Sequence, residues 1–286
     1  MTHTKGEGRR TKADVLRRHS RKRFGQHFLE PAWVRKVVDV IDPRPDDVIV
    51  EIGPGGGALT RPLAERAVAV VAIEIDRDLA AGLRRHAPAN VTVVEANVLD
   101  TDLAALVTEQ VARLDLAVPS IRIAGNLPYN ISSAILFRLV DLYHAGAGVT
   151  DATLMLQLEV VERLAAEAGS REYGVLSILA SLHADIGQLL TLPPGAFRPP
   201  PKVWSGVVRL RFGAPKVEVQ DKAVFEAVVK SIFTQRRKTL SNALKPFAAA
   251  RGREAAATIA AAGLDGRRRP ETLQLSELAR LAAIFS

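Results

Sequence analysis

The chain has 286 residues, 48% of them hydrophobic, which is enough for one large domain or two modest ones with a sizeable core. Its 39 Lys and Arg exceed its 31 Asp and Glu, and the resulting net charge of +8 favours a polyanionic partner such as nucleic acid. The lack of cysteine excludes disulfides, thiolate catalysis and Cys-ligated zinc, and it fits the cytoplasmic location that we expect.

Basic residues dominate the start of the chain. Residues 1–23 contain nine Lys and Arg against two acidic residues, with little apolar content before Val15. Such a segment cannot bury enough apolar surface to fold, so we expect residues 1–20 to form a disordered basic tail. This tail would attract RNA phosphates without sequence preference. The longest uncharged stretch, Ile123–Phe137, carries Asn, Ser and Pro, so we expect no membrane span.

Strands and helices alternate in the next part of the chain. An amphipathic pattern predicts a helix over Trp33–Ile41, which Asp42-Pro43 would end. A run of β-branched residues predicts a buried first strand at Val48–Ile52. Similar patterns predict strands at Val70–Ile73, Val91–Val94, Ile121–Ala124, Thr153–Gln157 and Gly206–Phe212, the last strand of the sheet, and helices at Ala58–Arg66, Ile131–Val140 and Val160–Ala168.

A glycine-rich loop, Gly53–Gly57, follows the first predicted strand. Because glycine lacks a Cβ atom and tolerates positive φ, Gly53 and Gly55 would let a ligand press against the backbone. Glu74 ends the second predicted strand, where a carboxylate can accept hydrogen bonds from ribose hydroxyls. The loop and the acid together predict a nucleoside-containing ligand.

Asn126-Leu127-Pro128-Tyr129 lies between a predicted strand and a predicted helix, where open α/β sheets bind ligands. Tyr129 offers a ring on which an adenine could stack. The Asn126 side-chain oxygen and the Pro128 carbonyl, separated by the apolar Leu127, could accept both hydrogens of the adenine N6. Accepting both would make that nitrogen nucleophilic. On these four residues alone, a proline-containing turn with Tyr129 in the core explains the pattern equally well.

The glycine pattern leaves a second enzyme class open. Gly53, Gly55 and Ala58 also satisfy the dinucleotide-binding fingerprint, so an NAD-dependent dehydrogenase is the first alternative. Pro54 stiffens the loop, and Glu51 ends the strand before it. The Asn-Leu-Pro-Tyr turn also has no evident task in hydride transfer. These features favour transfer of a group to an adenine.

A proline-rich stretch, Phe197–Val203, precedes the last predicted strand. Its three prolines would hold a stiff, extended segment. That segment could fix Phe197 against the second face of an adenine stacked on Tyr129, while Arg198 and Lys202 meet phosphates. A connector without a binding role is the alternative.

Residues after Gly213 are rich in alanine and follow a helical pattern. Apolar residues from Phe225 to Phe233 recur at the spacing of one helix face. Two basic clusters in this part predict contacts with RNA phosphates, with solvated helix faces as the alternative: Arg236, Arg237 and Lys238, and Arg267, Arg268 and Arg269.

Five segments of the chain together carry a family resemblance. Gly125–Ser132, GNLPYNIS, resembles motif IV of the KsgA/RsmA branch of the rRNA adenine dimethylases. Further matching segments are Arg23–Leu29, Tyr173–Ser177, Phe197–Val203 and Gln235–Leu240. The resemblance runs from about Arg21 to Ala283. Trp204 departs from it, because the family often has an acid at that position.

The resemblance implies a fold and a set of site residues. Residues 21–213 would form an α/β, Rossmann-like class I methyltransferase sheet dependent on S-adenosylmethionine, mainly parallel with one reversed strand near the edge. Residues 214–286 would form a small helical RNA-binding domain. Asn97 stands where the family usually has an aspartate that binds the cofactor adenine. The implied cofactor contacts are His27, Leu29, Gly53, Gly55, Glu74, Asn97 and Asn126, and the chemistry needs no metal.

The implied reaction is N6,N6-dimethylation of two adjacent adenosines in the hairpin loop near the 3′ end of small-subunit rRNA. The implied substrate is a pre-assembled small-subunit particle, and we expect a monomeric enzyme. Asn126, Leu127, Pro128, Tyr129 and Phe197 would form the catalytic pocket. Two further alternatives remain: an erythromycin-resistance type dimethylase of large-subunit rRNA, and a non-catalytic RNA-binding assembly factor.

Overall fold

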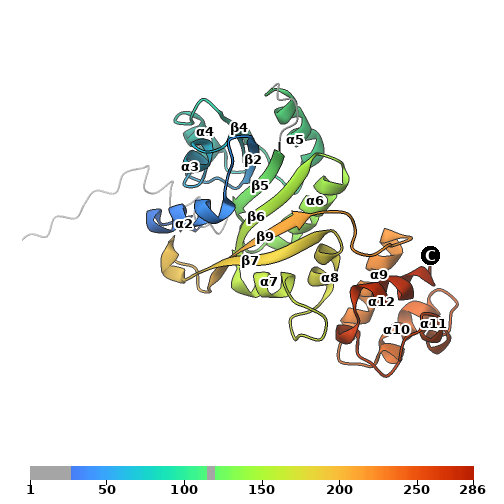
Figure 1. Ribbon diagram of the computed structural model, residues 1–286. Coiled ribbons are helices and arrows are strands. Elements are labelled where there is room, and N and C mark those ends of the chain that lie inside the picture. Colours follow the sequence, from blue (N-terminus) through green and yellow to red (C-terminus); the bar gives the residue numbers. More distant parts are fainter. Residues whose placement is uncertain (1–26, 115–119) are drawn as a thin grey trace, which may run out of the picture.

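The computed structural model describes residues 27–114 and 120–286, and a seven-stranded sheet forms its centre (Figure 1). The strand order is β4-β3-β2-β5-β6-β9-β7. Neighbouring strands from β4 to β6 are parallel, and β9 is antiparallel to both of its neighbours. The expected mainly parallel sheet with one reversed strand near the edge is therefore confirmed. The strands are β2 (Asp47–Ile52), β3 (Ala69–Glu74), β4 (Val91–Glu95), β5 (Ser120–Asn126), β6 (Val149–Gln157), β7 (Ala184–Leu192) and β9 (Ser205–Phe212).

Helices cover both faces of this sheet, because successive strand residues point to opposite sides. Val48 and Val50 of β2 face one cluster of buried residues, whereas Ile49 between them faces another. The first cluster includes residues of α5 (Leu103–Ala112), α6 (Ser132–His144) and α7 (Leu158–Leu164). The opposite face carries α2 (Pro31–Ile41), α3 (Thr60–Ala64) and α4 (Arg77–Arg84).

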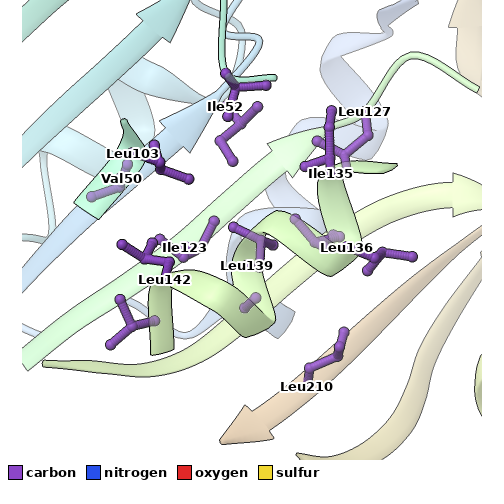
Figure 2. Close-up of a cluster of buried hydrophobic side chains, with 14 of the residues drawn as sticks. Val50, Ile52, Leu103, Ile123, Leu127, Ile135, Leu136, Leu139, Leu142 and Leu210 are labelled. Carbon is purple, nitrogen blue, oxygen red and sulfur yellow. The ribbon is translucent and has the colours of Figure 1, made fainter. Parts of the chain in front are cut away.

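Helix α6 fixes the segment that follows β5. Figure 2 shows its Ile135, Leu136 and Leu139 lying against the β2–β5 part of the sheet, with Leu127 at the end of the same cluster. Leu127 is 1% exposed, and its backbone N–H donates to the Met155 carbonyl at 3.1 Å. The chain between β5 and α6 is thus held on both sides.

Several element boundaries differ from the predictions. Helix α3 begins at Thr60, two residues later than predicted, because the chain still turns at Gly57, where φ is +81°. Helix α7 ends at Leu164, before the predicted Ala168. Helices α4 and α5 and strand β7 were not predicted. For both helices a signal existed, since Asp76 and Asp102 cap them through hydrogen bonds to backbone N–H groups.

Four helices follow the sheet and enclose a second hydrophobic core: α9 (Lys222–Thr234), α10 (Leu240–Ala249), α11 (Ala255–Ala261) and α12 (Leu275–Ala283). They lie together at one end of the molecule, next to α8 (Val175–Ser181) (Figure 1). Tyr173, Ile178, Leu179 and Leu182, from α8 and its flanks, are buried in this second core. The core therefore extends to both sides of residue 213.

Two shorter features complete the described structure. Strand β1 (Phe28–Leu29) pairs with β8 (Phe197–Arg198) in a small antiparallel sheet. Short 3₁₀ turns occur at Pro194–Ala196 and Pro270–Thr272. Within residues 27–114 and 120–286, every helix is too short or too polar to cross a bilayer. The predicted basic tail, residues 1–20, lies outside the described residues.

Candidate active site

A cavity opens at the carboxyl ends of the parallel strands. Its walls come from the segments that follow β2, β3, β4 and β5, together with the β1 segment. This edge of an α/β sheet is the usual ligand site, because loops from several strands meet there. The cavity brings together all of the predicted cofactor contacts, namely His27, Leu29, Gly53, Gly55, Glu74, Asn97 and Asn126.

The glycine loop has the backbone that its sequence predicts. Gly53 and Gly55 have φ values of +70° and +57°, which residues with a Cβ atom rarely adopt. The Gly55 N–H donates to Glu74 Oε2 at 2.9 Å, which connects the loop to the end of β3. Gly125 has a different role, since a Cβ atom there would lie 2.5 Å from the Ile52 carbonyl oxygen. Its glycine allows β5 to approach β2 just before the Asn126 turn.

Two buried carboxylates face the cavity. Glu74 is 3% exposed and accepts from the backbone N–H groups of Gly55 and Asp76, yet burial raises its pKa. Glu51 is 1% exposed, and burial raises its pKa to about 7, although Thr60 Oγ1 donates to it at 2.6 Å. The charge of Glu74 raises the Glu51 pKa further. A cationic ligand in this cavity would favour the ionised form of both acids.

Asn126 presents an acceptor to the cavity. Its Nδ2 donates to the His27 carbonyl at 2.8 Å. Because a carbonyl can only accept, this bond fixes the amide with its oxygen on the other side. Within the described part of the chain, no hydrogen bond engages Asn126 Oδ1. The Pro128 carbonyl accepts from the Ile131 N–H at 3.2 Å and retains a second lone pair.

Tyr129 lies at the cavity and not in the core. Its side chain is half-buried, and its ring stacks on His27 with centroids 5.7 Å apart and an interplanar angle of 26°. Its hydroxyl shares a 2.5 Å hydrogen bond with Ser205 Oγ, and burial raises its pKa. The alternative of a purely structural tyrosine is therefore disfavoured, and Ser205 is a neighbour that no sequence pattern indicated.

Phe197 is placed differently from the prediction. Its side chain is 1% exposed and lies in the core cluster that contains Leu29 and Met155. The pairing of β8 with β1 sets Phe197 opposite Leu29 and leaves the next residue, Arg198, exposed. The Phe197 ring does not line the cavity, so the expected two-ring sandwich with Tyr129 is absent from this conformation of the described residues.

Asn97, the departure from the family pattern, is already engaged in local bonds. Its Oδ1 accepts from the Leu99 N–H at 3.1 Å, and its Nδ2 donates to Asp100 Oδ2 at 2.5 Å. The bond to Asp100 fixes the amide orientation, and the oxygen keeps one lone pair.

The predicted RNA-binding residues fall into two groups. Arg268 is bound to both carboxylate oxygens of Glu277 and to the Thr272 carbonyl, and Arg236 donates to the Ser170 carbonyl. Arg268 therefore braces the helical part, and Arg236 ties it to the loop before α8, which the sequence did not indicate. Arg198 pairs with Glu30, and Arg267 pairs with Asp265. Of the predicted RNA-binding residues, Lys202, Arg237, Lys238 and Arg269 are exposed and have no side-chain partner within the described residues.

The two C-terminal basic clusters are adjacent. The backbone N–H of Leu240 donates to the Arg268 carbonyl at 2.7 Å, and that of Ser241 donates to the Gly266 carbonyl at 3.0 Å. These bonds join the loop that carries Arg237 to the loop that carries Arg269, so their exposed cations form one basic surface.

Comparison with known proteins identifies the family. The chain matches the ribosomal RNA adenine dimethylase family over residues 17–282. It is 49% identical over 234 residues to the ribosomal RNA small subunit methyltransferase A of Methylibium petroleiphilum, covering 81% of this chain and 86% of that protein. The protein of the same name from Myxococcus xanthus is 42% identical over 274 residues, which cover 94% and 93% of the two chains.

Solved structures share the fold. A dimethyladenosine transferase from Plasmodium falciparum superposes with a TM-score of 0.70 at 22% identity, covering 89% of this chain and 96% of that one. The 23S rRNA methyltransferase ErmE superposes with a TM-score of 0.63 at 26% identity, covering 90% and 98%. The fold is therefore the α/β methyltransferase fold with a helical C-terminal part, and the chain belongs to the ribosomal RNA adenine dimethylase family.

Proposed function

We propose that this chain dimethylates N6 of two adjacent adenosines in the 3′-terminal hairpin loop of small-subunit rRNA, within an immature small-subunit particle. We further propose that it acts as a cytoplasmic monomer. The observation that carries the proposal is that Asn126 Oδ1 accepts no hydrogen bond from the described residues and that Asn126 and Pro128 line the same cavity. Two fixed acceptors suit the two hydrogens of one exocyclic amine.

The residues of the turn would hold and activate the target base. Asn126 and Pro128 accept the N6 hydrogens, which leaves the N6 lone pair available to attack. His27 fixes the Asn126 amide, and Met155 fixes the backbone at Leu127. One face of the Tyr129 ring is covered by His27, so the adenine stacks on the opposite face or separates the two rings. Catalysis then rests on placement of the amine.

The cavity residues fit S-adenosylmethionine. Gly53 and Gly55 leave the backbone open, Glu74 offers a carboxylate for ribose hydroxyls, and Asn97 keeps one lone pair for an adenine amine. Two buried acids, Glu51 and Glu74, would balance the positive charge of the cofactor. When bound, this cofactor would supply an electrophilic methyl group on its sulfonium.

The basic surface would bind the rRNA backbone. Arg237, Lys238, Arg267 and Arg269 are exposed on two adjacent loops of the helical part, and Arg198 and Lys202 are exposed near the cavity. Each cation that neutralises a phosphate releases a counterion, so binding should weaken steeply with salt. Arg236 and Arg268 would contribute only by holding this surface in shape.

The choice of rRNA rests on the relatives. Those that match most of this chain carry the name small subunit methyltransferase A. The fold is shared with an enzyme named as a 23S rRNA methyltransferase, so the fold alone does not separate the two substrates. Incubation with radiolabelled S-adenosylmethionine and immature small subunits, large subunits or free rRNAs, followed by digestion to nucleosides, tests the proposal. We expect N6,N6-dimethyladenosine in the small-subunit sample alone, and label in large-subunit RNA would contradict this.

Substitution of Asn126 tests the mechanism. Asn126→Ala removes an acceptor for the amine, so we expect methyl transfer to fall below detection while RNA binding persists. Thermal unfolding with and without S-adenosylmethionine would check that the protein folds and binds the cofactor. Full activity in this variant would exclude the proposed role of the turn. No transfer by the wild-type protein, with intact RNA binding, would instead favour an assembly factor.

A further inference from the structure

The segment Pro199–Ser205 is attached at both ends to the two stacked rings of the cavity. At one end, His27 Nδ1 donates to the Pro199 carbonyl at 2.7 Å. At the other end, Ser205 Oγ and the Tyr129 hydroxyl share a hydrogen bond of 2.5 Å. Because both rings line the cavity, these two attachments place the segment next to the cavity wall.

Trp204 stands out in this segment. Its side chain is 52% exposed, the largest exposed fraction among the big hydrophobic residues of the described chain, and the preceding Val203 is 43% exposed. The Trp204 backbone is nevertheless fixed, since its carbonyl accepts from the Leu158 N–H at 2.9 Å. Within residues 27–114 and 120–286 the indole has no stacking or cation–π partner.

Charge and stiffness near Trp204 suit a nucleic-acid strand. Lys202 is exposed and has no ion-pair partner in residues 27–114 and 120–286, and the side chain of Arg198 is 83% exposed. Three consecutive prolines, residues 199–201, restrict the backbone between these cations. A cation that meets phosphate beside an aromatic ring that meets a base is the usual arrangement for binding single-stranded RNA.

Extrusion of the target base creates a partner for this ring. When an adenosine leaves its stack to enter the cavity, the neighbouring base loses a stacking contact, which costs free energy. An exposed indole on the segment beside the cavity wall can restore that contact on any base, because every base has a π-face.

We propose that Trp204 stacks on the nucleobase next to the target adenosine and thereby holds the RNA strand open at the cavity mouth. This proposal rests on the proposed function, because it takes the target base to lie in the cavity. Trp204 would then help to determine which loops are bound, and the adjacent adenosine would occupy this position while its neighbour is methylated.

Fluorescence of Trp204 tests the contact directly. The chain has two tryptophans, so Trp33→Phe leaves Trp204 as the only fluorescent indole. This variant is titrated with an RNA hairpin whose loop holds one adenosine between two bases, and with the same hairpin carrying abasic nucleotides at both flanking positions. We expect quenching by the first hairpin and little quenching by the second. Equal responses, or no response to either, would overturn the proposal.

Substitutions give an independent measurement. Trp204→Ala should weaken binding of the first hairpin by about 5- to 100-fold, as expected for one lost base stack, and leave cofactor binding unchanged. Trp204→Phe should retain most of the affinity. Phe137→Ala is the matched control, because Phe137 is also exposed, at 37%, but lies on α6 and not on the Pro199–Ser205 segment. Trp204→Ala with wild-type affinity would contradict the stacking role.

Failure of the proposed function would look different. In that case the wild-type protein would transfer no methyl group to any rRNA, whereas the fluorescence titration would still report whether Trp204 meets a base. Normal methyl transfer with no effect of Trp204→Ala on RNA binding would leave the function intact and reject this inference alone.

Discussion

The protonation of Glu51 should be coupled to the binding of a cationic cofactor. Burial raises its pKa from 4.5 to about 7, so the folded protein without cofactor favours the protonated acid. The contribution of the protonated Glu51 to the free energy of unfolding is therefore fully present below pH 4.5 and is lost as the pH rises through 7. A bound cation favours the carboxylate instead, so binding should release a proton from Glu51 near neutral pH.

We therefore predict that Glu51→Gln changes the pH dependence of S-adenosylmethionine binding. The ratio of wild-type to variant affinity should rise by about tenfold from pH 6 to pH 8, as Glu51 becomes ionised in the wild-type protein alone. Calorimetric titration at several pH values measures this ratio. Protonation of the ligand itself affects both proteins equally, so it cancels from the ratio. Glu109→Gln, an exposed acid on α5, is the control. A ratio that stays constant with pH would refute the coupling.

A buried arginine connects four elements at the amino end of the sheet. Arg122 of β5 forms ion pairs with Asp47 of β2 at 2.7 Å and Asp151 of β6 at 2.8 Å. It also donates to the carbonyls of Ile41 and Asp42 at the end of α2, at 2.7 and 2.8 Å. The Arg122 side chain is 8% exposed, and although this burial lowers its pKa, the two carboxylate partners together outweigh burial and raise the pKa above its ordinary value. This network holds the strands at the edge opposite the cavity.

Removing this arginine should be costly, because it would leave Asp47 buried without a cation. We predict that Arg122→Ala lowers the free energy of unfolding by about 3–5 kcal/mol. Urea denaturation followed by circular dichroism measures the change. Arg113→Ala is the matched control, since Arg113 forms an exposed pair with Glu109 on α5 and should cost less than about 0.5 kcal/mol. Equal effects of the two substitutions would show that the buried network adds little stability.

In the described part of the molecule, hydrophobic clusters lie on both faces of the sheet, and a further core lies among the C-terminal helices without being confined to them. Ile178 and Leu179 of α8 lie in it, and the Tyr173 hydroxyl donates to the Leu273 carbonyl at 3.1 Å. The Gly169 N–H also donates to the Glu271 carbonyl at 2.7 Å. Unfolding of the C-terminal helices would expose the apolar face of α8, so the two parts should stabilise each other.

We predict one cooperative unfolding transition for the full chain in scanning calorimetry. Tyr173→Phe should lower the free energy of unfolding by about 1 kcal/mol, because it removes one buried hydrogen bond and leaves the Leu273 carbonyl unpaired. The transition should stay single in this variant. Two separate transitions in the wild-type protein would instead show that the sheet and the C-terminal helices unfold independently, with a boundary near the predicted residue 213.

Most of the fold could be predicted from local sequence patterns, because each pattern reflects a local physical cause. A continuous run of β-branched residues predicts β2, which is buried throughout, and the glycine loop needs positive φ at Gly53 and Gly55. The segment after β5 marks a strand-to-helix turn. Strand β7 was missed because its residues are only partly buried and it pairs with β9, which follows it in the chain. Such pairing depends on residues far away in the sequence.

The candidate site likewise divides into features that the sequence predicted and features that depend on the tertiary structure. Sequence alone predicted most of the residues that meet at the cavity, with Phe197 as the exception, since motifs at the ends of parallel strands converge on one edge whatever the details of packing. Only the tertiary structure decided how they are used. The β1–β8 pairing buries Phe197, the Glu277 carboxylate engages Arg268, and Ser205 holds Tyr129. Each depends on contacts between different segments of the chain, and a local pattern does not encode which side of a strand or loop those segments cover.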